Sequence, residues 1–250
     1  TFYREDGSGR QLFARALQAA PEVDFTAEDG VRHVLRRVRD GVLIDAFKKL
    51  LDPLPVYIAD GHHRAASAVK VGLERRKANP EHTGEEEYNR FLAVVFPHDQ
   101  LKILPYNRVV RDLNGMSAAG FLKELGRSFE IGEAGSGTPP GPGRFCMFLD
   151  GRWLLLSPRF TPEGDTVARL DVSVLQNSIL GPLLGIRDPR KDTRIDFVGG
   201  LRGPGELERL VREGGFAVAF SLHPTSIEEL IEVADKGGLM PPKSTWFEPK

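Results

Sequence analysis

The stretch GEAGSGTPPGPG at residues 132–143 is the part of the chain least able to form a helix or a strand. Glycine adopts almost any backbone conformation, and proline has no amide hydrogen to donate to a ladder. A segment dense in both is typical of a flexible loop. It divides the chain into residues 1–131 and residues 144–250. We interpret it as a boundary between two α+β portions or as the tip of an insertion in a single domain.

Apolar periodicity on both sides of this loop indicates helices and strands that alternate without a regular period. Helices are expected at residues 11–20, 42–51, 62–78, 117–129, 171–185, 206–215 and 226–238. Strands are expected at residues 2–3, 55–59, 90–96, 101–110, 193–198 and 216–220, and on both sides of an Asp150-Gly151 hairpin turn. Residues 31–38 fit either a helix or an edge strand. The pattern favours an α+β fold with a mixed β-sheet and flanking helices.

The charge balance and the single cysteine narrow the classes of function. Lys and Arg number 34 against 35 Asp and Glu, so the chain lacks the field of a dedicated nucleic-acid binder. Cys146 has no second cysteine for a disulfide or a zinc site, which favours a reducing, cytoplasmic location. No apolar run approaches the roughly 18 residues that span a bilayer, so no membrane partner is expected. The chain begins at Thr1 rather than Met, and we interpret it as truncated at the N-terminus.

The clearest candidate site follows a VYIA run and precedes an alanine-rich helical pattern. It consists of Asp60, Gly61, His62, His63 and Arg64. Gly61 permits a sharp turn, so a helix is expected to begin near His62 with its first amide hydrogens unpaired. Such a terminus favours anions, above all phosphate, and the imidazoles and guanidinium add donors. Asp60 can hold Mg²⁺ or accept a hydroxyl proton. These residues predict a phosphate-binding turn on the surface, with a carboxylate beside it.

Simpler interpretations of this corner stay open. Asp60 would serve equally as a helix cap, the two histidines as a surface pair, and Arg64 as the partner of a glutamate. A zinc site is less favoured, because adjacent histidines rarely converge on one metal ion. The PPKST stretch at residues 241–245 has the same ambiguity. It offers an ammonium and two hydroxyls for an anion, yet its hydroxyls could equally cap a turn.

Several separate blocks of the sequence, in order and over essentially the whole chain, resemble the DUF1015 family. They are YIADGHHRAASA, YNRFLAVVFPHDQLKILPYNRVV, LDVSVLQNSILGPLLGI, RIDFVGG, HPTSIEELIEVADKGG and MPPKSTWFEP. The family in turn resembles free-serine kinases, which share a strand-DGHHR-helix corner and a C-terminal Pro-Lys-Ser/Thr-Thr stretch. The resemblance implies a ParB/sulfiredoxin-like core around that corner. It also implies a kinase that converts free L-serine to O-phospho-L-serine, with ADP or ATP as phosphoryl donor and Mg²⁺ as cofactor.

The same resemblance implies roles for eight residues. Asp60 matches a catalytic, metal-associated aspartate. Residues of the phosphate-gripping turn match Gly61, His62, His63 and Arg64, and the last three of these are also implied to act in catalysis. The stretch that contacts the substrate or its phosphate matches Lys243, Ser244 and Thr245, so the C-terminal portion is expected to complete the site.

Two departures from the family pattern keep other functions open. Asn107 stands where family members usually have His, and the upstream glutamate base of the kinase aligns with nothing in this chain. One alternative is a ParB-like nucleotide-binding regulatory or DNA-partition module, which would need a basic recognition helix. Another is a non-catalytic fragment of the family. The leading expectation is a small-molecule enzyme with no nucleic-acid partner, and its oligomeric state is left open.

Overall fold

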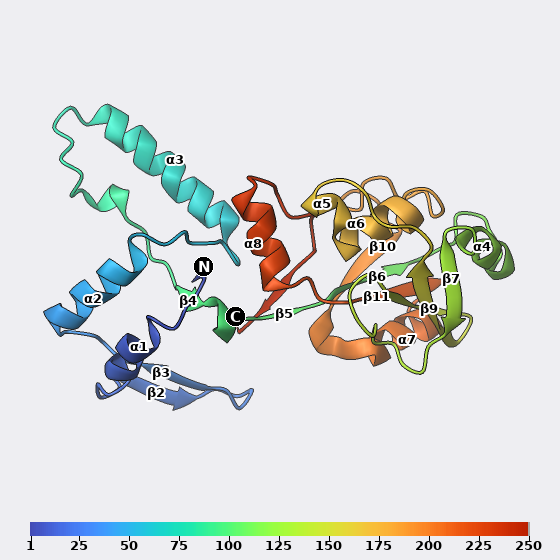
Figure 1. Cartoon of the computed structure of the whole chain (residues 1–250), viewed down its shortest axis with the longest axis horizontal. Coiled ribbons are helices and arrows are strands. Elements are labelled where there is room, and N and C mark those ends of the chain that lie inside the picture. Colours follow the sequence, from blue (N-terminus) through green and yellow to red (C-terminus); the bar gives the residue numbers. More distant parts are fainter. Residues whose placement is uncertain (250) are drawn as a thin grey trace. The chain divides into compact units, whose positions relative to one another are not determined.

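The structure, a computed structural model, describes residues 1–249, and the chain forms two compact units, residues 1–101 and residues 102–250 (Figure 1). Residues 132–143, which the sequence offered either as a boundary or as the tip of an insertion, lie within the second unit, and the two units divide between residues 101 and 102. The reason is strand pairing, because residues 102–110 pair with strands from the C-terminal third of the chain. Within residues 1–249, no helix is both long enough and apolar enough to cross a bilayer.

Unit 1 contains short strands and three helices. Its elements are β1 (Phe2–Tyr3), α1 (Arg10–Ala16), β2 (Val23–Thr26), β3 (Arg32–Leu35), α2 (Gly41–Leu51), α3 (His62–Ala78), η1 (Glu87–Asn89), β4 (Phe96–Pro97) and η2 (His98–Gln100). Strands β2 and β3 form an antiparallel hairpin, so the ambiguous residues 31–38 adopt the strand alternative. The predicted helices at 42–51 and 62–78 are confirmed almost to the residue.

A small aromatic core lies where three distant segments of unit 1 meet. Phe2 and Tyr3 are fully buried, and β1 pairs in parallel with β4. Phe2 also bridges to Tyr57, whose ring stacks on it at 5.3 Å. Helices α1 and α2 pack through the rings of Phe13 and Phe47, 5.1 Å apart. This core fixes residue 57, and therefore the start of the segment that leads into α3.

Two strands that the apolar runs predicted, at residues 55–59 and 90–96, do not form. Outside the bridge at Tyr57 and the two residues of β4, these segments have no ladder partner. Ile58 is 47% exposed and Leu92 is 94% exposed. An apolar run supplies side chains for a sheet, but a strand also needs a neighbour for its backbone hydrogen bonds.

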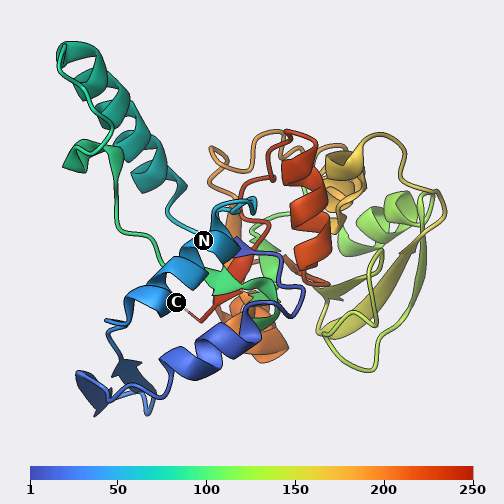
Figure 2. The same ribbon diagram turned by 60° about the vertical axis from the view of Figure 1, so that its left-hand side comes forward.

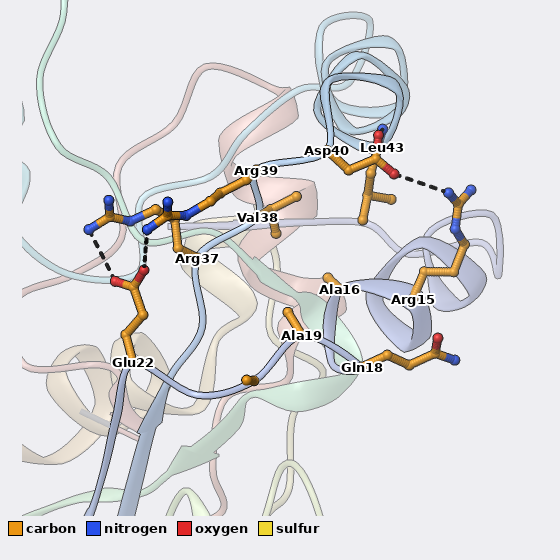
Figure 3. A pocket seen from close by; sticks show the side chains of 11 residues that line it. Arg15, Ala16, Gln18, Ala19, Glu22, Arg37, Val38, Arg39, Asp40 and Leu43 are labelled. Carbon is orange, nitrogen blue, oxygen red and sulfur yellow. Dashed lines mark hydrogen bonds and ion pairs between the residues drawn. The ribbon is translucent and has the colours of Figure 1, made fainter.

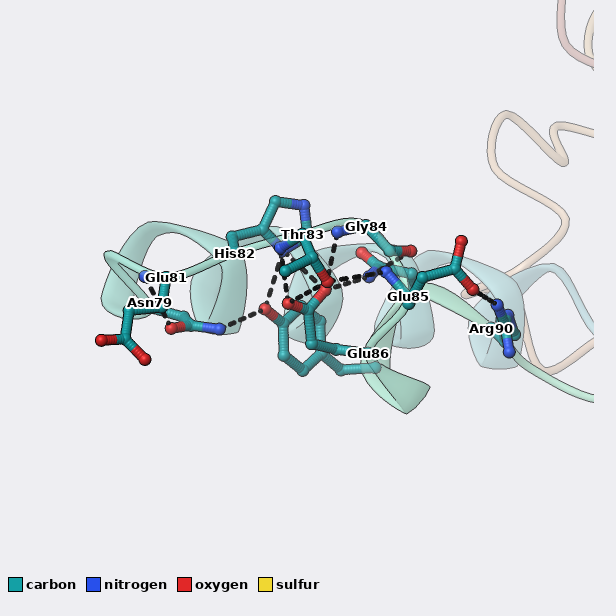
Figure 4. Close-up of polar contacts among 10 residues, drawn as sticks. Asn79, Glu81, His82, Thr83, Gly84, Glu85, Glu86 and Arg90 are labelled. Atoms are coloured by element: carbon teal, nitrogen blue, oxygen red, sulfur yellow. Dashed lines mark hydrogen bonds and ion pairs between the residues drawn. The ribbon is translucent and has the colours of Figure 1, made fainter.

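The segment that follows α3 runs back along the helix, as Figure 1 and Figure 2 both show. Gly72 allows this approach, because a Cβ there would lie 2.8 Å from the carbonyl oxygen of Tyr88. Glu86 closes the loop by accepting hydrogen bonds from the amides of Thr83 and Gly84 and contacting His82 (Figure 4). The hydrogen bond donated by the Thr83 backbone amide, together with the other hydrogen bonds to this carboxylate, lowers the pKa of Glu86 to about 2.

Unit 2 is built on a six-stranded sheet with helices on both faces. Its elements are β5 (Lys102–Leu104), β6 (Tyr106–Val110), α4 (Ala118–Leu125), β7 (Phe129–Glu133), β8 (Phe145–Leu149), β9 (Arg152–Pro158), α5 (Thr166–Arg169), α6 (Asp171–Leu175), η3 (Gln176–Leu180), β10 (Ile195–Gly199), η4 (Gly200–Arg202), α7 (Gly203–Glu213), β11 (Val218–Leu222), α8 (Ile227–Asp235) and β12 (Trp246–Glu248). The sheet order is β10-β6-β11-β8-β9-β7, with antiparallel pairs throughout. The α+β class predicted from the sequence is confirmed.

Successive side chains of β8 and β11 point to opposite faces of the sheet, and each face is covered by a hydrophobic core. Phe145, Met147 and Leu149 join the larger core, which α4, α6 and α8 help to build. Phe148 faces the opposite side and joins the core beneath α7. The helices on both faces leave neither side of these strands to solvent, so both strands are almost entirely apolar, with the buried Ser221 of β11 as the exception.

Local signals in unit 2 are confirmed in detail. Asp150 and Gly151 both adopt positive φ, at 50° and 75°, as a two-residue hairpin between β8 and β9 requires. Ser226 and Glu229 form the complete capping box at the start of α8. The Gly/Pro-rich residues 134–144 connect β7 to β8 within the sheet. The predicted helix at 171–185 consists of α6 followed by a turn of π-helix.

Asn107 joins two neighbouring strands through its side chain. It is 2% exposed, and its Oδ1 accepts the amide hydrogen of Leu222 at 3.1 Å, beyond the last paired residues of β6 and β11. Asn107→Ala should lower the free energy of unfolding by about 1–3 kcal/mol, since it leaves a buried N–H unpaired. Urea unfolding measures this. The exposed Asn177→Ala serves as the control, and an equal loss there would contradict the explanation.

Candidate functional site

The residues 60–64, named here the DGHHR turn, form one tight corner in unit 1. Gly61 has φ of 79°, in the left-handed region that favours glycine, and α3 begins at the next residue. The predicted turn and helix start are therefore confirmed. Asp60, His62, His63 and Arg64 are all exposed, so the corner faces solvent.

The N-terminus of α3 has no side-chain cap. In α2, by contrast, Asp40 accepts the amide hydrogens of Val42 and Leu43, and Ser226 caps α8 in the same manner. Gly61 has no side chain to do this, and no capping bond is made at that end. The helix therefore presents unpaired amide hydrogens and the positive end of its dipole. Asp60 does not serve as the cap that the simpler interpretation suggested.

The polar side chains of the turn lie at this terminus. The rings of His62 and His63 lie with their centres 4.0 Å apart, inclined by 43°. The Arg64 guanidinium is 3.9 Å from the Asp60 carboxylate, and the two side chains are 85% and 76% exposed. An ion pair so long and so exposed contributes little stability, so either partner can exchange it for a ligand at small cost.

The turn meets the modest requirements of a magnesium ion. Mg²⁺ commonly uses one or two protein carboxylates and takes its other ligands from water and substrate phosphates. Asp60 offers one exposed carboxylate next to the open helix end. Within residues 1–249 there is no group of three His, Cys, Asp or Glu side chains that could hold a metal ion unaided. The residues therefore fit a metal that arrives with phosphate rather than a permanent site.

An apolar hollow of about 590 Å³ lies along α3 and begins at the turn. His62 lines one part of it, and Ile58, Val69 and Leu73 line the rest, with Lys70 among the polar residues. Val69 and Leu73 are more than half exposed, and α3 buries none of its residues. The hollow thus offers apolar surface directly beside the DGHHR turn.

Gly61→Ala should weaken this corner through backbone strain. A Cβ at residue 61 would lie 2.9 Å from the Arg64 guanidinium, a flexible group that can move, so the left-handed φ sets the cost. We expect a loss of about 1–2 kcal/mol in unfolding free energy. Gly41→Ala, at the start of α2 where a Cβ meets nothing within 4 Å, is the matched control and should be neutral or stabilising. Thermal unfolding that ranks the two variants equally would contradict this account.

The second predicted group, residues 243–245, lies in unit 2 and is named here the KST segment. Lys243 has φ of 55°, unusual for a lysine, and its exposed ammonium lies 5.4 Å from the centre of the Tyr106 ring. Ser244 is 4% exposed, and its carbonyl oxygen accepts the hydroxyl of Thr225 at 3.3 Å. The segment is held firmly before it enters β12.

Arg108, which the sequence analysis did not select, lies behind the KST segment. It is 4% exposed and donates to the carbonyl oxygens of Tyr106 and Lys243, the second at 2.8 Å. Burial lowers its pKa to about 10, so it stays charged at neutral pH. The signal in the sequence is the pair Asn107-Arg108 inside an otherwise apolar strand.

A partly buried carboxylate, Asp171, is a further feature of unit 2. It begins α6 and accepts the amide hydrogen of Gly143 at 2.8 Å. Burial raises its pKa to about 6, assisted by Glu229 and opposed by the Gly143 hydrogen bond and by His223. A carboxylate that titrates near neutrality can serve in proton transfer, although its position alone assigns no such role.

A second hollow in unit 1, of about 520 Å³, is bordered by arginines (Figure 3). Arg37 and Arg39 both contact Glu22 at 3.0 Å, and Arg15 contacts Asp40 at 3.5 Å. Each of these guanidiniums is more than half exposed and already paired. Such pairs are worth at most about 1 kcal/mol each, and they join the loops around the hollow.

The chain was compared with known proteins first by sequence and then by structure. The family model described as "Protein of unknown function (DUF1015)" matches residues 1–173. No curated protein matches the chain. Among solved structures it is similar to a mutant free serine kinase in complex with AMP, at 16% identity and a TM-score of 0.42, over 76% of this chain and 66% of that one. The chain therefore spans slightly less than two thirds of that kinase chain.

Two other structures show similar values. A second mutant free serine kinase with AMP matches at 14% identity and a TM-score of 0.39, over 98% of this chain and 82% of that one. A conserved hypothetical protein from Pyrococcus furiosus matches at 16% identity and a TM-score of 0.40, over 76% and 68%. All these scores lie below 0.5, so the likeness assigns no activity to this chain.

Proposed function

The chain belongs to the DUF1015 family, and we propose that it is a nucleotide-dependent phosphotransferase whose phosphate-binding element is the DGHHR turn. The observation that carries this proposal is the open N-terminus of α3, which has no side-chain cap and whose first three residues carry two imidazoles and a guanidinium. Unpaired amides, the helix dipole and a guanidinium fork act together on phosphate oxygens. The exposure of the whole group leaves it accessible to a ligand from solution.

Catalysis at such a turn would consist of positioning and charge neutralisation. Arg64 and the two histidines bind the phosphates and offset the charge that develops during transfer. Asp60 accepts the proton of the acceptor hydroxyl or helps to hold Mg²⁺. When bound, Mg²⁺ would supply further neutralisation of the phosphates.

The hollow along α3 supports a nucleotide as the phosphoryl donor. A nucleotide joins a charged phosphate chain to a flat, largely apolar base. The phosphates would bind at the DGHHR turn, while the base would lie against Ile58, Val69 and Leu73. Inorganic phosphate or polyphosphate would gain nothing from this apolar surface, whereas ADP or ATP would.

We propose free L-serine as the acceptor and the KST segment as the group that binds it. The support is the sequence resemblance to free-serine kinases, together with the chemistry of the segment. The exposed Lys243 ammonium suits a carboxylate or a phosphate, and Thr225 and Arg108 hold the backbone around it. The product would be O-phospho-L-serine.

Isothermal titration with ADP and ATP, with and without Mg²⁺, tests the first step of the proposal. We expect micromolar dissociation constants, on the order of −8 kcal/mol. Arg64→Gln should weaken binding about tenfold, whereas Arg76→Gln, at the other end of the same helix, should leave it unchanged. Mass spectrometry of phosphoserine formed from L-serine tests the second step. If neither ADP nor ATP binds, with or without Mg²⁺, the proposal is refuted.

A further inference from the structure

Arg108 is a buried charge without an opposite charge beside it. Its guanidinium lies 5.3 Å from the centre of the Phe197 ring and bonds to two backbone carbonyls. Among residues 1–249 no acidic side chain forms an ion pair with Arg108, and no carboxylate is among the groups that shift its pKa. A cation removed from water without a counter-charge is costly, and a neutral donor would satisfy a carbonyl more cheaply. The guanidinium is therefore expected to do more than fill space.

Lys243 is held by a hydrogen bond from the Arg108 guanidinium to its carbonyl oxygen. A lysine at φ of 55° is strained, because its Cβ crowds the following carbonyl. Two side chains of unit 2 hold this strained turn. Arg108 donates a hydrogen bond to the carbonyl oxygen of Lys243, and the Thr225 hydroxyl donates one to the carbonyl oxygen of Ser244. Without the first bond, Lys243 would relax toward a negative φ and its ammonium would leave the Tyr106 ring. Residues held in strained conformations by their surroundings are typical of functional sites.

We propose that Arg108 is a positioning residue for the KST segment, holding Lys243 in its left-handed turn so that the ammonium is preset for an oxyanion. The buried charge of Arg108 adds to that of Lys243, so the segment favours a carboxylate or a phosphate. The identity of that oxyanion, the carboxylate of the acceptor or its transferred phosphate, rests on the proposed function. The role of Arg108 in holding the turn at Lys243 does not rest on the proposed function.

Hydrogen exchange of the full chain, followed by mass spectrometry, tests the holding directly. Arg108→Met should increase exchange of amides in residues 243–248 by about tenfold or more, beyond the increase in β8, which reports global unfolding. Arg212→Met is the matched control, because its guanidinium also lies 5.3 Å from a ring, that of Phe148, but on the exposed surface. Equal increases in residues 243–248 and in β8 would show a merely structural role and overturn the proposal.

A second variant tests the strain itself. Glycine adopts positive φ freely, so adding Lys243→Gly to Arg108→Met should return the exchange of residues 243–248 most of the way to the wild-type rate. Lys243→Ala in the same Arg108→Met background keeps the strained φ, so it should not restore the exchange rate. Failure of the glycine to rescue would contradict the assigned role of Arg108.

Kinetics then separate the positioning role from the proposed function. Arg108→Lys keeps a charge but cannot reach both carbonyls, so KM for L-serine should rise about tenfold while kcat changes less than about threefold. L-serinamide, which lacks the carboxylate, should be insensitive to the substitution if the carboxylate is the oxyanion and sensitive if the phosphate is. If the wild-type chain transfers no phosphate, the proposed function fails, and the exchange experiments still decide the role of Arg108.

Discussion

Asp60→Asn is expected to lower the turnover of phosphotransfer by about 10²–10⁴-fold. Asparagine keeps the size of the side chain but can neither accept the hydroxyl proton nor carry the negative charge that attracts Mg²⁺. The fold should not change, because the Asp60 side chain is 76% exposed and its ion pair with Arg64 is 3.9 Å long, while its charge also acts on the N-terminal ammonium of Thr1. Initial-rate assays of phosphoserine formation measure the effect, and circular dichroism checks the fold.

The control for this prediction is another exposed aspartate of unit 1. Asp45→Asn, whose side chain is 69% exposed and lies 4.0 Å from Lys48, should retain full turnover. Asp60→Asn with more than a third of the wild-type turnover would show that the carboxylate takes no part in the chemistry. The nucleotide affinity would then decide whether the DGHHR turn binds phosphate at all.

The features that the sequence predicted well are those set by a few neighbouring residues. The backbone turns at Gly61 just before α3 begins, Asp150 and Gly151 form a hairpin turn, and the Ser226 side chain caps α8. In each case the deciding interaction lies within four residues. The geometry of the DGHHR turn therefore followed from its own residue types, and its exposure confirms that these groups face solvent.

The features that the sequence predicted poorly depend on distant partners. The strand at 90–96 failed because no neighbouring strand pairs with residues 91–95, whatever their apolar character. The division at residue 101 follows from pairs such as Trp246 with Leu104, far apart in the chain. Arg108 was missed for the same reason, since its burial is created by Phe197 and Lys243, both remote in sequence.

Asp171→Asn is expected to stabilise the protein at neutral pH by about 2–3 kcal/mol. Burial raises the pKa of Asp171 from 3.8 to about 6, so holding it ionised at pH 7 costs folding free energy. Asparagine removes that cost and still accepts the Gly143 amide hydrogen through its own oxygen. Glu229, which repels the charge, and His223, which attracts it, are the neighbouring titratable groups.

The sign of the pH dependence follows from this raised pKa. Between about pH 4 and pH 6 the folded state binds the Asp171 proton more tightly than the unfolded state, so this residue makes stability fall as pH rises. The advantage of Asp171→Asn should therefore be largest above pH 6 and vanish below about pH 4. Urea unfolding from pH 3.5 to 8 measures it, with the exposed Asp196→Asn as a control expected to change stability by less than about 0.5 kcal/mol. A constant difference across this range would mean that Asp171 is not held in its protonated form by burial.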